Sequence, residues 1–356
     1  MKQPALGIVS TALVIAVSLG FVHLFSFATF TGWVAYYLLC LIPMQIVTAV
    51  LWKCGLPSFA GKAAQPLKGI LLLITCLVVG AIVAYAYWQI AGAAVSPPAP
   101  MLAMCTIVSV IITFWFCIIW GGWPFTAFIK NELAAGFVTL IAAYIVNYLI
   151  FRVLFDYSFM AGAPVYVPSL DPHGPFNAWS ALVCELTVCT VLFLVLNFDL
   201  WPFTKFPALM KQPMLGLAWA AVSLIIGGTA FYLGVNVAGM DVVAFMVKVP
   251  IPFIFGTILV TNMMQGSLFG KLAQPLKGVL NTIASAVIGI VLALIYGALS
   301  STVTGTVKPG PPSYDFEIWL ASALLAVTFP FLIYYAEFFQ MWPLRKSEQA
   351  QAAAAD

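Results

Sequence analysis

The segment Ala64-Gln65-Pro66-Leu67-Lys68-Gly69, followed at once by the uncharged run ILLLITCLVVGAIVAYAYW (70–88), decides the fold of this chain. The same six residues return 209 positions later as Ala273 to Gly278. A second motif, Lys2-Gln3-Pro4-Ala5-Leu6-Gly7, returns at the same offset as Lys211-Gln212-Pro213-Met214-Leu215-Gly216. Two motifs that share one offset predict that the first four helices and the last four are copies of each other. The copies lie six helices apart, an even number, so we expect a parallel duplication.

The composition of the chain is that of a membrane protein. Of its 356 residues, 63% are hydrophobic and 7% are charged, whereas about 25% are charged in an ordinary soluble domain. Apolar stretches of about 20 residues, the length of a helix that crosses a bilayer, recur along the whole chain. We therefore expect an integral membrane protein in contact with the lipid bilayer. The formal net charge of +3 is too small to indicate a nucleic-acid partner.

The apolar runs predict an all-α protein with ten transmembrane helices, each long enough to cross about 30 Å of hydrocarbon. The predicted spans are 6–28, 32–53, 69–93, 101–121, 135–156, 177–199, 215–237, 242–264, 278–300 and 316–341.

The basic residues indicate the orientation of these spans. If the N-terminus is cytoplasmic, 11 of the 14 basic residues lie in cytoplasmic segments: Lys2, Lys53, Lys62, Lys68, Lys130, Lys205, Lys211, Lys271, Lys277, Arg345 and Lys346. This asymmetry follows the positive-inside rule. We expect a multi-pass protein of the cell inner (plasma) membrane with both termini in the cytoplasm. The first span is too long for a signal peptide, so we expect it to be retained.

A finer unit recurs within the duplication. Each odd-numbered helix begins at a Gly, and most even-numbered helices end near Trp-Pro, as at Trp123-Pro124, Trp201-Pro202 and Trp342-Pro343. Trp anchors a helix at the membrane interface, and Pro stops it. The chain is therefore predicted to be five two-helix repeats. We divide it into a first four-helix repeat pair (1–130), a central two-helix unit with a long outer loop (131–210), a second four-helix repeat pair (211–345) and a cytoplasmic tail (346–356).

Several chemistries are excluded by what the chain lacks. Its seven Cys include no C-x-x-C pair, and six lie in apolar spans as small buried hydrophobes. Of its two His, only His23 lies in a span, so two intramembrane His cannot hold a haem. We expect no cofactor, no metal site and no enzyme activity. An intramembrane enzyme acting on lipid, with Glu185 and His23 as an acid-base pair, is a minor alternative because no nucleophile accompanies them.

The candidate site is a polar layer in the outer half of the membrane. Sixteen residues separate these positions from the inner end of each helix, so they lie at one depth in the membrane. Four of the residues at this depth are charged or ionisable. In the central unit, the polar Asn147 also occupies the position at which three other odd-numbered helices have a Gly. Unpaired polar groups in a membrane usually face a cavity. We predict an outer vestibule lined by His23, Tyr85, Asn147, Arg152, Glu185, Tyr232 and Lys248, with residues 157–176 as a partial lid.

A structural role for the same charges stays open. In this alternative, Glu185 and Arg152 form an ion-pair brace, while the side chains of Lys248 and His23 extend to the outer interface.

A second group of polar residues lies at the inner ends of the even-numbered helices: Asn197, Asp199, Glu337 and Gln340. They allow a proton or cation relay, although carboxylates near a Lys-rich boundary are more often solvated. We assign no role to Asn262 and Gln265.

These features favour a transporter or channel for a small polar, anionic or zwitterionic solute or ion. The alternative is a non-catalytic membrane subunit of a larger complex that docks through its cytoplasmic loops, which are rich in Trp, Phe, Pro and Lys. Those loops also leave room for a partner protein or a homo-oligomer.

Overall fold

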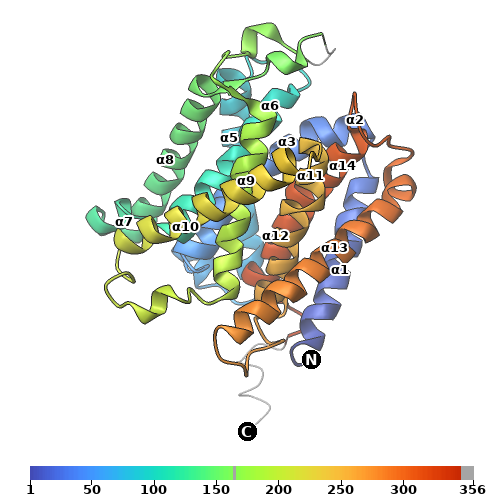
Figure 1. The fold of residues 1–356 in the computed structure, drawn as a ribbon. Helices are drawn as coiled ribbons and strands as arrows, with labels where there is room; N and C mark the ends of the chain where they lie inside the picture. The colour runs from blue at the N-terminus through green and yellow to red at the C-terminus, as the bar shows by residue number, and fades with distance from the viewer. Residues whose placement is uncertain (163–165, 346–356) are drawn as a thin grey trace.

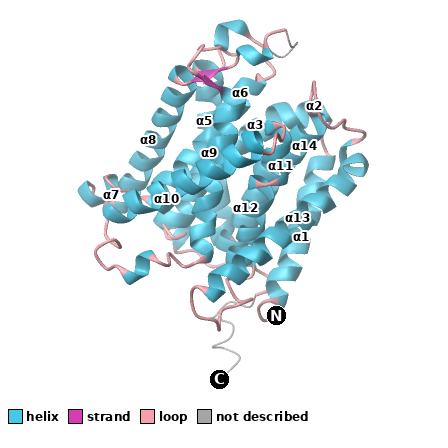
Figure 2. Ribbon diagram, viewed as in Figure 1, coloured by secondary structure: helices cyan, strands magenta, loops and turns pink. Residues whose placement is uncertain are grey.

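The computed structural model describes residues 1–162 and 166–345. Residues 163–165 of the predicted lid and the predicted tail 346–356 lie outside the described residues. Helices dominate the described chain, which also holds one short parallel pair of strands, β1 (Phe155–Asp156) and β2 (Phe176–Asn177) (Figure 2). Ten helices in this part of the chain are long and apolar enough to cross a membrane, so the protein is a polytopic membrane protein.

The ten spans end within five residues of the predicted boundaries. Five of them are α1 (Ala5–His23), α5 (Leu67–Ile90), α8 (Glu132–Val153), α10 (Met214–Phe231, continued to Val237) and α13 (Leu276–Thr304). The other five alternate with these along the chain. They are α2 and α3 (Phe27–Thr29 and Ala35–Ile46, within Phe27–Leu51), α6 (Pro100–Phe114, continued to Ile119), α9 (Ala178–Asn197), α11 and α12 (Val242–Lys248 and Pro250–Ile258, continued to Met263), and α14 and α15 (Asp315–Ser322 and Phe329–Ile333, within Asp315–Phe338). Two short helices, α4 (Ser58–Gly61) and α7 (Phe125–Phe128), lie in loops.

This second set of spans forms a closed inner ring. Helix α3 packs against α6, α6 against α9, and α9 against α12. Helix α12 packs against residues 323–328, which join α14 to α15, and these residues pack back against α3. Within its most apolar window each inner span is 56% to 72% buried, compared with 22% to 44% for the other five spans. The inner ring is therefore the core of the protein.

The first set of spans covers this ring from outside (Figure 1). Helix α5 packs on α3, α8 on α6, α10 on α9 and α13 on α12, and α1 packs on residues 323–328. Each outer helix thus lies on the inner span that precedes it in the chain, and α1 completes the circle on the last one. Large apolar side chains such as Ile82, Ile225 and Leu294 remain 64% to 68% exposed on the outer helices, as expected of side chains that face lipid.

Glycines bring the outer helices close to the ring at the lower end of the bundle, the end at which the N-terminus lies (Figure 1). A Cβ atom on Gly69 would lie 2.5 Å from Cδ1 of Phe339, and one on Gly216 would lie 2.5 Å from Cε3 of Trp120. The remaining outer helices make the same kind of contact, with Gly7 on Met263, Gly136 on Trp52 and Gly278 on Phe198. Such close approach through small residues is typical of helix packing in lipid.

The inner spans are interrupted near their lower ends. Four of them finish on a π-helical turn: Val47–Leu51, Trp115–Ile119, Leu259–Met263 and Tyr334–Phe338. The fourth inner span is also broken higher up, where α11 ends at Lys248 and α12 begins at Pro250. Pro250 has no N–H to continue the hydrogen-bond ladder of α11. π-helical turns occur frequently at functional sites, and these four converge on one end of the ring.

Candidate functional site

A polar cavity of about 460 Å³ lies at the lower end of the inner ring. We call it the lower vestibule. Its polar and charged lining comes from Lys53, Cys54, Gln65, Gln265, Glu337, Gln340 and Arg345, and the rest comes from Ala49, Ala336, Phe339 and Trp342. The vestibule is thus built from the ends of the first, fourth and fifth inner spans, together with the residue pair that leads into α5.

A shared backbone turn places three of these side chains. Each inner span is capped by one aromatic or Met residue, and two residues with positive φ follow it. The first of the two is Lys53, Gly121, Asp199, Gln265 or Gln340. Lys53, Gln265 and Gln340 line the vestibule, with φ between 47° and 52°. Positive φ is uncommon for residues other than Gly and often marks a functional constraint. The turn therefore directs equivalent positions of different spans to one cavity.

The acidic group of the vestibule is Glu337. Its Oε1 accepts a hydrogen bond of 2.9 Å from Nδ2 of Asn262, which links the fifth inner span to the fourth. Cys54 lies nearby. Burial raises the pKa of the Cys54 thiol to about 12, with a further rise from Glu337 and an opposing effect of Lys68. Because only the thiolate is a good nucleophile, Cys54 remains an unreactive thiol at neutral pH.

Gln65 differs from its three counterparts in the other Gln-Pro pairs. In Gln3, Gln212 and Gln274, Oε1 accepts a hydrogen bond of 3.0–3.1 Å from the backbone N–H of the Gly four residues later. Gln65 donates from Nε2 to the carbonyl oxygen of Phe338 at 2.7 Å. Its Oε1 is buried and has no hydrogen-bond partner among the described residues. A buried acceptor without a partner is costly, and the other three Gln-Pro pairs avoid this cost.

Aromatic rings close the interior of the ring above the vestibule. The ring of Phe114 in α6 meets Phe193 in α9 edge-on at 5.3 Å and Phe329 in α15 at 5.7 Å. Helices α6 and α15 are not neighbours in the inner ring, because α3 lies between them. The contact between Phe114 and Phe329 therefore crosses the interior of the ring. At 1.5 Å per residue these two rings lie about 7 to 14 Å above the lower ends of their spans.

The structure does not bring the seven predicted site residues together. Five of them are exposed: His23, Tyr85, Arg152, Tyr232 and Lys248. The His23 imidazole only bonds the carbonyl oxygen of Val303, at 2.7 Å. Within the described residues, no ion pair joins Glu185 to Arg152 or to Lys248.

Asn147 and Glu185 are the two predicted residues that face the interior. Asn147 Nδ2 donates to Tyr87 Oη at 2.9 Å and contacts Cys105 Sγ at 3.3 Å. Asn147 Oδ1 and Glu185 Oε2 are buried with no hydrogen-bond partner in the described part of the chain. Both residues lie in the upper half of the bundle, far along their helices from the lower vestibule.

The predicted relay residues at the inner ends of the even-numbered helices also divide between surface and buried positions. Asp199 is at the surface, where its Oδ2 pairs with Nζ of Lys277 at 2.6 Å. Asn197 is buried and donates to Ser285 Oγ at 3.3 Å. Only Glu337 and Gln340 of this group line the vestibule.

The described part of the predicted lid, residues 157–162 and 166–176, is held by one carboxylate. Asp171 Oδ1 accepts from the backbone N–H groups of Tyr157 and His173, at 3.1 and 2.9 Å, and Oδ2 accepts from Tyr166 Oη at 2.8 Å. Burial opposes ionisation of Asp171, but these hydrogen bonds outweigh it, so the pKa is lowered from 3.8. Asp156, Asp171 and His173 offer three ligand atoms within 4.8 Å of one another. Since both oxygens of Asp171 already serve the loop, we assign this cluster a structural role.

Most of the vestibule lining was not predicted from the sequence. Glu337 and Gln340 were predicted as relay residues, whereas Asn262, Gln265, Lys53 and Gln65 had no predicted role in a site. A usable signal was present, because Lys53, Gln265 and Gln340 each directly follow the residue that caps an inner span, Trp52, Met264 or Phe339.

Comparison with known proteins adds no assignment, because no protein-family model, no curated protein and no solved structure matches this chain. The class that the fold defines is that of a polytopic helical membrane protein.

Proposed function

We propose that the protein is a membrane transporter or channel, and that its solute binds in the lower vestibule. The observation that carries this proposal is a polar, charged cavity at the end of a closed five-helix ring. In the proposed function the solute crosses the membrane inside the ring of helices, and the Phe114 contacts close this route above the cavity. Ligand sites between helices of a bundle are a common arrangement.

The solute class follows from the charges of the vestibule. Lys53 and Arg345 are the basic groups of its lining, and Glu337 is the acidic one. The excess of positive charge favours an anionic or zwitterionic group.

In the proposed orientation the lower end faces the cytoplasm and the protein spans the cell inner (plasma) membrane. The support is the concentration of Lys and Arg in the lower loops, as the positive-inside rule requires. Asn147 and Glu185 then lie on the outer side, where their unpartnered oxygens are candidates for the outer part of the pathway.

We also propose that the chain consists of five tandem two-helix repeats, with the first four and last four helices a parallel duplication. Two regularities support this. Each inner span ends on a pair of positive-φ residues, and each outer helix begins with a Gly packed against the lower end of an inner span. Five repeats that make the same contacts close into a ring.

A membrane subunit of a larger complex is the second candidate function. It is favoured by exposed aromatic residues in the lower loops, where Phe59, Phe128 and Phe206 are 56% to 80% exposed. Such residues suit a protein contact surface, although they also suit anchoring at the membrane interface. In this candidate function the purified chain alone binds no solute.

The test is a thermal-shift screen of the purified protein with small anions and amino acids, followed by uptake into proteoliposomes. A ligand at 100 times its dissociation constant adds about 2.7 kcal/mol to folding stability. We expect a stabilising solute to be taken up by the wild type and to lose both effects in Glu337→Gln and Lys53→Gln. Lys271→Gln, in a lower loop outside the vestibule, is the matched control. Uptake that both vestibule variants retain in full would refute the proposal.

A further inference from the structure

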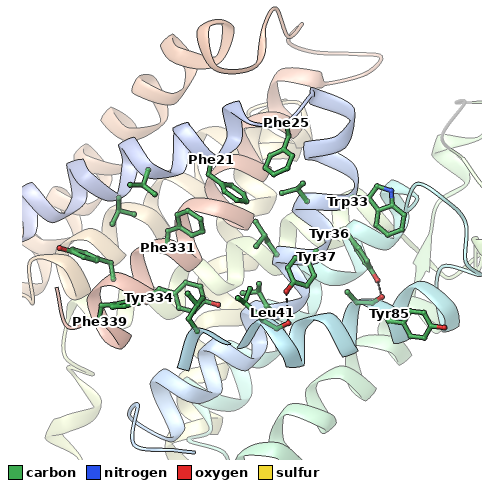
Figure 3. A pocket seen from close by; sticks show the side chains of 18 of the residues that line it. Phe21, Phe25, Trp33, Tyr36, Tyr37, Leu41, Tyr85, Phe331, Tyr334 and Phe339 are labelled. Carbon is green, nitrogen blue, oxygen red and sulfur yellow. Dashed lines mark hydrogen bonds between the residues drawn. The ribbon is translucent and has the colours of Figure 1, made fainter. Parts of the chain in front are cut away.

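A second, apolar cavity of about 1020 Å³ lies beside the lower vestibule. We call it the lateral groove. It runs between the outer helices α1 and α5, and its floor is formed by α3 and the last inner span (Figure 3). Phe21, Tyr37, Leu41, Leu77 and Phe331 are among its lining residues. All of the lining except Phe25 and Phe339 belongs to membrane-spanning helices, so the groove faces hydrocarbon.

The lining of the groove is almost entirely apolar. No charged side chain takes part in it. The Tyr36 hydroxyl donates to the carbonyl oxygen of Ala84, and the Tyr37 hydroxyl donates to that of Leu77 at 3.0 Å. These two tyrosines therefore present mainly their rings to the groove, as Figure 3 shows. The groove is suited to a hydrocarbon chain.

The length of the groove suits such a chain. Along α5 it extends from Leu73 to Trp88, which is about 22 Å at 1.5 Å per residue. A lipid tail, which is thin and flexible, fills the space without displacing α1 or α5.

The lateral groove and the lower vestibule meet at one side chain. Phe339 lines both cavities, and its ring lies on Gly69 at the start of α5. Figure 3 places Phe339 at one end of the groove, opposite Trp33 and Tyr85. A charged compartment at the membrane boundary thus adjoins an apolar compartment that runs into the membrane. An amphiphile likewise has a charged or polar head group joined to an apolar chain.

We infer that the two cavities together bind an anionic phospholipid, with its head group in the vestibule and an acyl chain in the groove. Lys53 and Arg345 supply positive charge for the phosphate. The aromatic lining from Phe339 to Trp88 contacts the chain. The inference rests on the proposed function, since it names the class of solute for the same vestibule. It also assigns a lateral route of entry, from the membrane between α1 and α5.

The experiment measures lipid retained by the protein after transfer from nanodiscs to detergent, by native mass spectrometry. The nanodiscs contain equal amounts of phosphatidylglycerol and phosphatidylcholine. We expect the wild type to retain phosphatidylglycerol at least tenfold over phosphatidylcholine. Equal retention of the two lipids would overturn the inference.

Two pairs of variants locate the lipid. Leu77→Phe narrows the groove and should lower phosphatidylglycerol retention about tenfold, whereas Val78→Phe, on the exposed neighbouring position, should not. Lys53→Gln should abolish the preference for the anionic lipid, and Lys271→Gln should leave it unchanged. Lys53→Gln folds because Gln already stands at the equivalent turn positions, Gln265 and Gln340. Phosphatidylglycerol retention that neither Leu77→Phe nor Lys53→Gln lowers would also refute the inference.

The outcome also separates this inference from the proposed function. If a water-soluble anion stabilises the wild type and is transported while phosphatidylglycerol is not retained, the lipid inference fails and the transporter proposal stands. If neither the lipid nor a soluble solute binds, the vestibule has no solute and both proposals fail.

Discussion

Gly227 and Gly228 are neighbours in α10 with opposite surroundings, and they give a matched test of how outer helices pack on the ring. A Cβ atom on Gly227 would lie 2.5 Å from Cα and 2.9 Å from the backbone N of Val188 in α9. A Cβ atom on Gly228 would meet nothing within 4 Å. Because backbone atoms cannot rotate aside, Gly227→Ala has to push α10 away from α9. Overpacking costs about 1–3 kcal/mol, and we expect the upper end of this range.

The assay is thermal unfolding of both variants in one detergent. At about 2–4 °C per kcal/mol, Gly227→Ala should lower Tm by about 6–12 °C. Gly228→Ala should leave Tm unchanged or raise it by a few degrees, because Ala is favoured over Gly in a helix by about 1 kcal/mol. Equal Tm values for the two variants would refute the packing of α10 on α9, and with it the division into inner and outer helices.

Two further predictions concern the hydrogen bonds of single side chains. Because the pKa of Asp171 is lowered below 3.8 in the folded loop, its ionised form stabilises the loop above that pH, and the stabilisation is lost as pH falls below about 4. Hydrogen exchange of residues 154–162, corrected for intrinsic rates, should therefore become faster as the pH falls from 5 to 3. Asp171→Asn should make this exchange faster already at pH 7. A wild-type exchange rate that does not change with pH would contradict this prediction. Trp52→Phe removes the 3.0 Å bond from Nε1 to the carbonyl oxygen of Glu132 and should cost about 0.5–1.5 kcal/mol. Trp120→Phe, for which no indole hydrogen bond exists among the described residues, should cost less in the same unfolding assay.

The spans were predictable from the sequence because apolar runs end abruptly at polar or turn residues. The predicted helix 177–199 is Ala178–Asn197 in the structure, and the predicted 242–264 is Val242–Met263. The largest differences are at 28 and 32, where α1 ends at His23 and the next span begins at Phe27. Residues 24–31 (LFSFATFT) carry no charge on either side of this turn, so hydropathy alone does not locate it.

The ring was not predictable, because lipid-facing and protein-facing side chains are both apolar in a membrane. Mean hydropathy is 1.8 to 2.6 for the outer spans and 1.9 to 2.5 for the inner spans. The same difficulty explains the site. Counting residues gave a common depth for Arg152, Glu185 and Lys248, but depth does not determine the face of the helix, and both basic residues are exposed. The turn that presents Lys53 and Gln340 uses positive φ at non-Gly residues, which their sequence does not reveal.

The central claim is that the interior of the inner ring is a conduit closed at Phe114. The most direct test is the anion conductance of planar bilayers or proteoliposomes that contain Phe114→Ala. A second variant, Phe151→Ala, removes an equally buried ring from the outer helix α8 and controls for loss of packing, which costs about 3–5 kcal/mol. We predict that Phe114→Ala, but not Phe151→Ala, has a conductance well above that of the wild type. Conductance that stays at the wild-type level in a folded Phe114→Ala protein would contradict the claim.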